Sequence, residues 1–138
     1  NRYIIQYKEI CFCIVTDIGH ATPEIQDLVS QATHLVIESN YDTQMLTNGP
    51  YPVRLKKRIE GPYGHISNKE TAELLLNHLN PTRIKQVWLC HLSEENNTPS
   101  LAGETSKNAI KEVPELQHIT PQPLPRRQPT GVIEITLD

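Results

Sequence analysis

The chain has 138 residues, a formal net charge of −3 at pH 7 and a hydrophobic content of 37%, which suits one small soluble domain. No run of about 18 apolar residues occurs, so we expect no membrane-spanning helix. The start, Asn1-Arg2-Tyr3, lacks a basic head followed by an apolar stretch, and the single methionine is Met45. We therefore expect a cytoplasmic protein whose reading frame begins upstream of Asn1 or is processed.

The first third of the chain predicts a hairpin, a helix and a buried strand. Residues 3–7 and 10–16 are rich in β-branched and aromatic side chains, and Lys8-Glu9 lies between them as the turn. Thr22-Pro23 is typical of a helix start, with Thr as the cap and Pro at the first helical position. The continuous apolar run of residues 34–38 indicates a strand that is buried on both faces.

The middle of the chain predicts two helices separated by a loop. Residues 40–52 read as a polar segment, and residues 52–59 predict a short, basic helix. Ser67 and Glu70 match a capping box, which predicts a helix from there to about residue 79, where Pro81 stops it.

The last third begins with a buried strand over residues 84–89 and a helix from Thr98-Pro99 to about residue 111. Residues 114–130 are proline-rich and predicted to be irregular, and residues 131–137 predict a final strand. Taken together, the order of elements predicts an α/β layered fold.

Three cysteines, Cys11, Cys13 and Cys90, fall on predicted strands. No Cys-x-x-Cys pair occurs, which argues against a zinc knuckle. We interpret all three as buried thiols of a reducing compartment.

Polar side chains stand at the predicted strand ends, where catalytic and metal-binding groups tend to gather. Asp17 precedes Gly19, and its two carboxylate oxygens suit a bridge between two metal ions, although a turn aspartate that caps its own backbone has the same pattern. His91 ends a buried strand, where an imidazole is placed to bind zinc or manganese or, alternatively, to bond a backbone carbonyl in the core.

His65 lies at the start of the helix that Ser67 caps, where the helix dipole favours an anion such as phosphate. A histidine there can protonate a leaving oxygen, and Glu38, at the end of a strand, can orient it. The alternative is a surface histidine beside a strand-end glutamate.

The basic run of the short helix is either a solvated helix face or a surface that follows a phosphate backbone. Tyrosines flank this run on both sides and suit stacking on bases. The residues concerned are Arg54, Lys56, Lys57 and Arg58, with Tyr41, Tyr51 and Tyr63.

Several short segments together resemble the metallo-β-lactamase superfamily and, within it, the YycJ/WalJ-like branch of nucleases. They occur in the family's order and spacing over roughly residues 10 to 105. The segments are 16–19 (TDIG), 35–42 (LVIESNYD), 45–46 (ML), 49–52 (GPYP), 55–56 (LK), 58–59 (RI), 64–68 (GHISN) and 89–97 (LCHLSEENN).

The resemblance implies a role for each matching position. Asp17 and His91 would bind metal, while His65 would contact the scissile phosphate as a catalytic residue with Glu38 as its partner. In such enzymes two divalent metal ions, zinc or manganese, promote hydrolysis of a phosphodiester. The expected substrate is nucleic acid, in particular DNA, with contacts from Ser67, Asn68, Arg58 and Tyr63.

The chain departs from the family in lacking the metal-binding cluster His-x-His-x-Asp-His, which belongs to the N-terminal half of the family's fold. The resemblance therefore implies that residues 1–138 are a single partial domain, the C-terminal half of a four-layer αββα sandwich. We expect such a half to bind metal weakly, to be inactive alone and to expose a sheet face through which it can self-associate.

Two other functions stay open at this point. A half-domain without a complete metal site suits a non-catalytic interaction module that pairs with another chain. The same scaffold also hydrolyses small esters, thioesters and lactams, so the fold alone does not choose the substrate.

Overall fold

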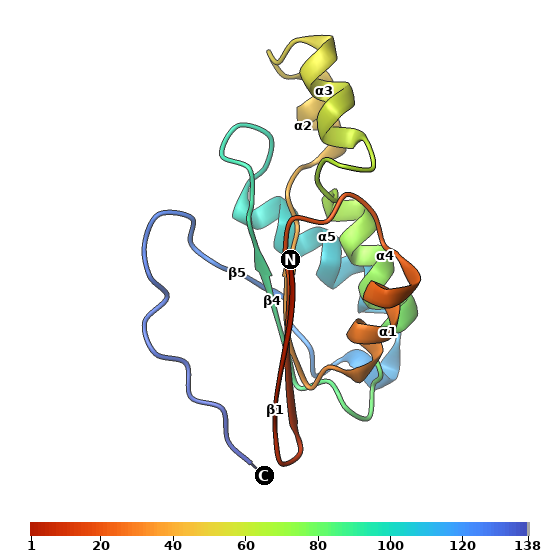
Figure 1. The fold of residues 1–138 in the computed structure, drawn as a ribbon, viewed down its shortest axis with the longest axis vertical. Coiled ribbons are helices and arrows are strands. Elements are labelled where there is room, and N and C mark those ends of the chain that lie inside the picture. Colours follow the sequence, from red (N-terminus) through yellow and green to blue (C-terminus); the bar gives the residue numbers. More distant parts are fainter. Residues whose placement is uncertain (138) are drawn as a thin grey trace.

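A computed structural model describes residues 1–137 and begins with the predicted hairpin (Figure 1). Strand β1 (Arg2–Tyr7) pairs antiparallel with β2 (Ile10–Val15), and Lys8 in the turn has the left-handed backbone angle φ of 52°. Cys11, Cys13 and Val15 alternate along β2 and are buried, because successive side chains of a strand point to opposite faces.

The rest of the sheet is parallel and follows the order of the chain. Strand β3 (His34–Glu38) lies between β2 and β4 (Gln86–Cys90), and the two-residue strand β5 (Gln122–Pro123) completes the order β1-β2-β3-β4-β5. The carboxyl ends of the neighbouring parallel strands β2, β3 and β4 therefore meet at one edge of the sheet, which is where such folds place their sites.

Three helices cover one face of the sheet: α1 (Pro23–Gln31), α4 (Asn68–His78) and α5 (Pro99–Ile110). Crossover connections between parallel strands are right-handed as a rule, so strands that follow one another in order place their helices on the same side. Figure 1 shows these helices side by side on that face. The core lies between the helices and the sheet, with side chains such as Leu35, Ile37 and Leu89 fully buried.

The opposite face of the sheet carries Phe12, Ile14 and Val36, which are partly exposed, and Trp88. Residues 124–137 run along this side without a helix or a strand (Figure 1) and enclose a cavity of about 220 Å³ against Phe12, Val36 and Trp88. The predicted strand over residues 131–137 is wrong, because this segment packs Ile133 and Ile135 against the face of the sheet and pairs with neither of its edges.

Residues 43–60 form an arm at one end of the molecule, made of α2 (Thr43–Asn48) and α3 (Val53–Glu60) (Figure 1). The sequence predicted α3 but not α2, which falls in the stretch interpreted as a polar segment. Asp42 begins α2 by accepting a hydrogen bond from the Met45 amide at 3.0 Å, and Leu46 is its one buried side chain. Residues 114–130 contain only the 3₁₀ turn η1 (Pro114–Leu116) and β5, as their irregular prediction indicates. No helix within residues 1–137 is both long and apolar enough to cross a membrane.

Candidate active site

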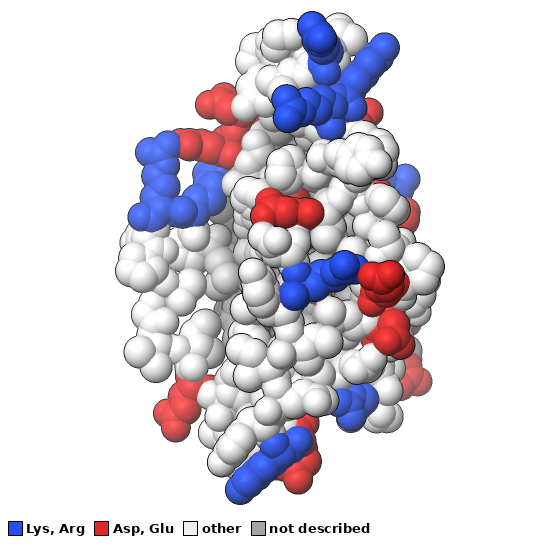
Figure 2. Space-filling view, in the orientation of Figure 1, with Lys and Arg blue, Asp and Glu red and all other residues white. Residues whose placement is uncertain are grey.

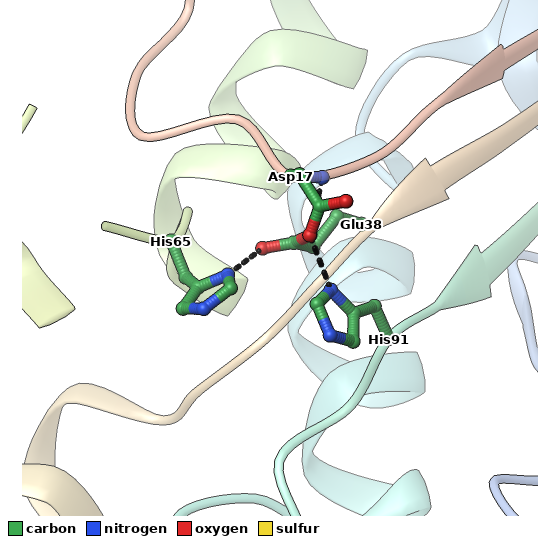
Figure 3. A group of neighbouring side chains, drawn as sticks. All are labelled: Asp17, Glu38, His65 and His91. Carbon is green, nitrogen blue, oxygen red and sulfur yellow. Dashed lines mark hydrogen bonds and ion pairs between the residues drawn. The ribbon is translucent and has the colours of Figure 1, made fainter. Parts of the chain in front are cut away.

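Four predicted site residues meet at the carboxyl edge of the sheet (Figure 3). Asp17 follows β2, Glu38 is the last residue of β3, and His91 follows β4, while His65 comes from the loop before α4. One ligand atom from each of the four lies within 4.8 Å of all the others. The sequence predicted each of these residues singly, and the order of the parallel strands is what brings them together.

Glu38 is the centre of this cluster. Its side chain is fully buried, and its Oε1 lies 2.7 Å from His91 Nδ1 and accepts the Asp17 amide at 2.8 Å. Its other oxygen, Oε2, lies 2.8 Å from His65 Nδ1. An ionised carboxylate can only accept hydrogen bonds, so both rings donate through Nδ1 and each leaves Nε2 free for a metal ion or a substrate. The sequence analysis paired Glu38 with His65 alone, and the contact with His91 was missed.

Backbone strain coincides with the two predicted metal ligands. Asp17 has φ of 53° and His91 has φ of 55°, and apart from Lys8 these are the non-glycine residues of positive φ in residues 1–137. Such a conformation costs of order 1 kcal/mol and persists where the surroundings hold it. The Glu38 carboxylate holds the Asp17 amide, and Asn40 Nδ2 donates to the His91 carbonyl at 2.8 Å. Strain at these two residues supports a functional reason for their placement.

Close backbone contacts join the loops that carry Asp17 and His65. A Cβ atom on Gly19 would lie 2.0 Å from the Pro62 carbonyl oxygen, and one on Gly64 would lie 2.1 Å from the Ile59 carbonyl oxygen. Only glycine permits these approaches, because any side chain would overlap the facing backbone. The His65 amide also donates to the Ile59 carbonyl at 2.9 Å. The loop that carries His65 is therefore held against the Asp17 loop at Pro62 and against α3 at Ile59.

A buried amide network supports the edge of the sheet beneath the cluster. Asn68 Oδ1 accepts from Ser39 Oγ at 2.6 Å and from Asn97 Nδ2 at 2.9 Å, and Asn97 Nδ2 also reaches the carbonyls of Ser39 and Asn40. Buried polar groups whose hydrogen bonds are made in this way rigidify their surroundings. The sequence analysis included Asn97 in the segment 89–97 but gave it no role.

The donor set fits a metal ion of the zinc or manganese class. The Asp17 carboxylate is about half exposed and its Oδ1 lies 3.4 Å from His91 Nδ1, while two imidazoles offer free Nε2 atoms. Carboxylate and imidazole ligands suit these metals, and a second carboxylate behind a metal-binding histidine is the usual support. Asp17, His65 and His91 supply three ligands at most, fewer than a closed site needs.

Cys90 is the nearest thiol to the cluster and is not a nucleophile at neutral pH. Burial, and then the charges of Glu38 and Asp17, raise the pKa of its thiol to about 12. Burial also raises the pKa of Cys13 to about 12. All three cysteines are free. Cys11 and Cys13 are buried as predicted, whereas Cys90 is only partly buried.

The four predicted substrate-binding residues fall in two places. Ser67 and Asn68 belong to the framework, since Ser67 Oγ caps α4 by accepting the Glu70 amide at 3.1 Å and Asn68 lies in the amide network. Arg58 and Tyr63 lie in the arm and the loop after it, where the Tyr63 side chain is 99% exposed. Contact of these residues with a substrate stays a prediction.

The ends of three neighbouring strands and the loop before α4 thus gather two histidines and two carboxylates at one edge of an α/β protein, a set of side chains that could hold a metal ion. No family model matches the chain. Two WalJ exodeoxyribonucleases, from two strains of Streptococcus pneumoniae, are 38% identical to it over 99 residues, which are 72% of this chain and 36% of each relative. A YycJ exodeoxyribonuclease from Bacillus anthracis is 32% identical over 99 residues, again 72% of this chain and 37% of the relative.

The chain is therefore related to the YycJ/WalJ-like nucleases of the metallo-β-lactamase superfamily, as the resemblance of its motifs implied. It spans about a third of the length of the curated relatives it matches.

Proposed function

We propose that this chain is the C-terminal half of a metal-dependent phosphodiesterase, a DNA exonuclease-like enzyme whose dinuclear site is completed by an N-terminal half. The observation that carries the proposal is the single buried carboxylate of Glu38, which holds both histidines and the Asp17 backbone in one place. The names of the relatives support a nuclease, and a nuclease of this class works on DNA.

The layers of the fold support a half-domain. Helices cover one face of the sheet only. The other face carries the apolar side chains of Phe12, Ile14, Val36 and Trp88, over which residues 124–137 run without a helix or a strand. A second sheet packed there would bury these side chains and produce the four layers of an αββα sandwich. Without it, the same face is the natural place for two copies to associate.

Each residue of the cluster has a role in this proposal. Asp17 and His91 would hold metal, zinc or manganese, together with ligands from the N-terminal half. When bound, the metal ions supply Lewis-acid stabilisation of the charge on a phosphodiester. His65 would direct its Nε2 to the scissile phosphate. A ring protonated on both nitrogens would give its Nε2 proton to the leaving oxygen, and the Glu38 carboxylate, which accepts from Nδ1, would orient and stabilise that imidazolium.

The test separates catalysis from metal binding in the protein expressed from its complete reading frame. Because His65 would act on the phosphate, His65→Gln should lower release of nucleotides from end-labelled DNA by about 100-fold or more. Metal content, measured by mass spectrometry, should stay close to that of the unchanged protein. The matched control is His78→Gln, at a partly exposed position at the end of α4, and it should keep the rate.

Three results would contradict the proposal. One is a DNA-cleavage rate that His65→Gln leaves unchanged. Another is hydrolysis of a small thioester or lactam by a protein that does not hydrolyse DNA, which would favour the small-substrate alternative. The third is a tight dimer that binds no metal, as expected of a non-catalytic interaction module.

A further inference from the structure

We infer that the arm of α2 and α3 is a second contact surface for single-stranded DNA, separate from the metal cluster. The inference rests on the proposed function for the identity of the ligand. It concerns residues outside the cluster, and its test measures DNA binding and not DNA cleavage.

The arm concentrates positive charge on a chain that is acidic overall. Four of the eight residues of α3 are basic and one is acidic. Figure 2 shows these Lys and Arg side chains gathered at the end of the molecule that α3 forms. Within residues 1–137, Arg54, Lys57 and Arg58 take part in no ion pair, whereas Arg2 and Arg127 are paired with Glu24 and Glu94. The arm therefore presents uncompensated charge that suits a polyanion.

The charge of α3 is not needed to fold the helix. No residue of α3 is buried. Of its basic residues, Lys56 alone donates a side-chain hydrogen bond within residues 1–137, from Nζ to the Thr47 carbonyl at 2.8 Å. That bond ties α3 to α2, which Leu46 anchors. The remaining basic side chains are left to the solvent, and like charges one turn apart destabilise a helix slightly, so a ligand would relieve their repulsion.

A shallow hollow of about 420 Å³ lies on the arm and combines charge with apolar surface. Pro52, Arg54, Leu55 and Arg58 line it. Arg54 and Arg58 are four positions apart and share one face of the helix, while Leu55 and Pro52 supply the apolar part. Planar guanidinium groups match phosphate oxygens in pairs, and the apolar part suits the sugar or base between two phosphates. An acidic peptide would use the charge but not the apolar surface.

An exposed aromatic ring extends this surface toward the active site. Tyr63 follows α3 and is 99% exposed, so its ring makes almost no contact within the protein and is open to a ligand. Bases of a single strand are free to stack on such a ring, whereas those of a duplex are not. The same loop continues to His65, whose amide bonds the Ile59 carbonyl of α3. A strand held on the arm would thus be led toward the cluster.

The experiment measures binding of the 138-residue chain to a fluorescent single strand of about 16 nucleotides by anisotropy, without metal. The double variant Arg54→Gln, Arg58→Gln should weaken binding about 10-fold and lower the dependence of log K on log salt by about 1.4, which is about 0.7 for each lost phosphate contact. Tyr63→Ala should weaken binding about 5-fold at unchanged salt dependence. The double variant Lys107→Gln, Lys111→Gln, on and just after α5, removes the same charge elsewhere and should leave the affinity unchanged.

Circular dichroism checks that the variants keep the helix content of the unchanged chain. Equal loss of affinity in the two double variants, or no loss in the arm variant, would overturn the inference. So would equally tight binding of polyglutamate, which offers charge without bases. This experiment follows binding and not hydrolysis, so the two proposals fail in different ways. If the proposed function is wrong, the arm still binds DNA but the complete protein does not cleave it. If the arm is wrong, the complete protein cleaves DNA, but the arm variant and the α5 variant bind it equally well.

Discussion

Glu38 and His91 are 53 positions apart in the chain, yet Oε1 of the first lies 2.7 Å from Nδ1 of the second. The other oxygen of Glu38 holds His65 at 2.8 Å, so one buried carboxylate orients both rings. Removing a charge from Glu38 therefore acts on two histidines at once, although Glu38 has no exposed surface and cannot itself reach a substrate.

Glu38→Gln keeps the size of the side chain and replaces one accepting oxygen with a donating amide. One of the two rings then faces a donor and must turn or change tautomer, which should weaken metal binding about 10- to 100-fold. Titration with zinc in a calorimeter measures this affinity. Glu104→Gln, on the exposed side of α5, is the control. Equal affinities for both variants would show that Glu38 does not support the metal ligands.

Gly19→Ala tests the contact between the loops that carry Asp17 and His65. The new methyl group would lie 2.0 Å from the Pro62 carbonyl oxygen, so the loops must separate, and we expect a loss of about 1–3 kcal/mol in the free energy of unfolding. Gly103→Ala, inside α5, is the matched control. Its methyl group would lie at an ordinary 3.5 Å from Pro123, and alanine favours a helix, so the free energy of unfolding should rise by up to about 1 kcal/mol. Urea denaturation measures both, and similar effects of the two variants would exclude the contact as a constraint.

The buried His34 should make stability depend on pH. Burial, and then the charge of Lys85, lower the pKa of His34, so the folded protein prefers the neutral ring. Below about pH 6.5 the unfolded chain binds a proton that the folded protein resists, and the free energy of unfolding therefore falls as the pH drops and is fully kept above that value. His34→Gln should flatten this fall between about pH 7 and about pH 5. The control is His20→Gln, at an exposed position, and a fall that persists in His34→Gln would assign it to other groups.

Most of the fold could be predicted because local signals and tertiary structure agree. The capping box of Ser67 and Glu70 is present with both hydrogen bonds, and the continuous apolar run of residues 34–38 forms β3 with the same bounds. The failures lie where tertiary context decides. Residues 131–137 alternate like a strand but lie along a face of the sheet and form no strand, and α2 is too short and polar to show a helical period.

The cluster could be predicted one residue at a time but not as a network. Strand ends indicated Asp17, Glu38 and His91, and the helix start indicated His65. That Glu38 serves both histidines depends on the register of β3 and β4, which pairs Glu38 with Cys90 and so places His91 beside it. Sequence patterns do not encode the supporting residues Asn40 and Asn97, because a buried amide has no period or spacing of its own.

The central claim is that the Glu38 cluster is half of a metal site for hydrolysis of DNA. Its most direct test is metal content together with manganese-dependent release of nucleotides from end-labelled DNA, for the protein expressed from its complete reading frame and for its Asp17→Ala variant. Loss of a metal ligand predicts less bound metal and a rate lowered about 100-fold or more, with the circular dichroism spectrum unchanged. An Asp17→Ala variant that kept full metal content and full rate would contradict the account.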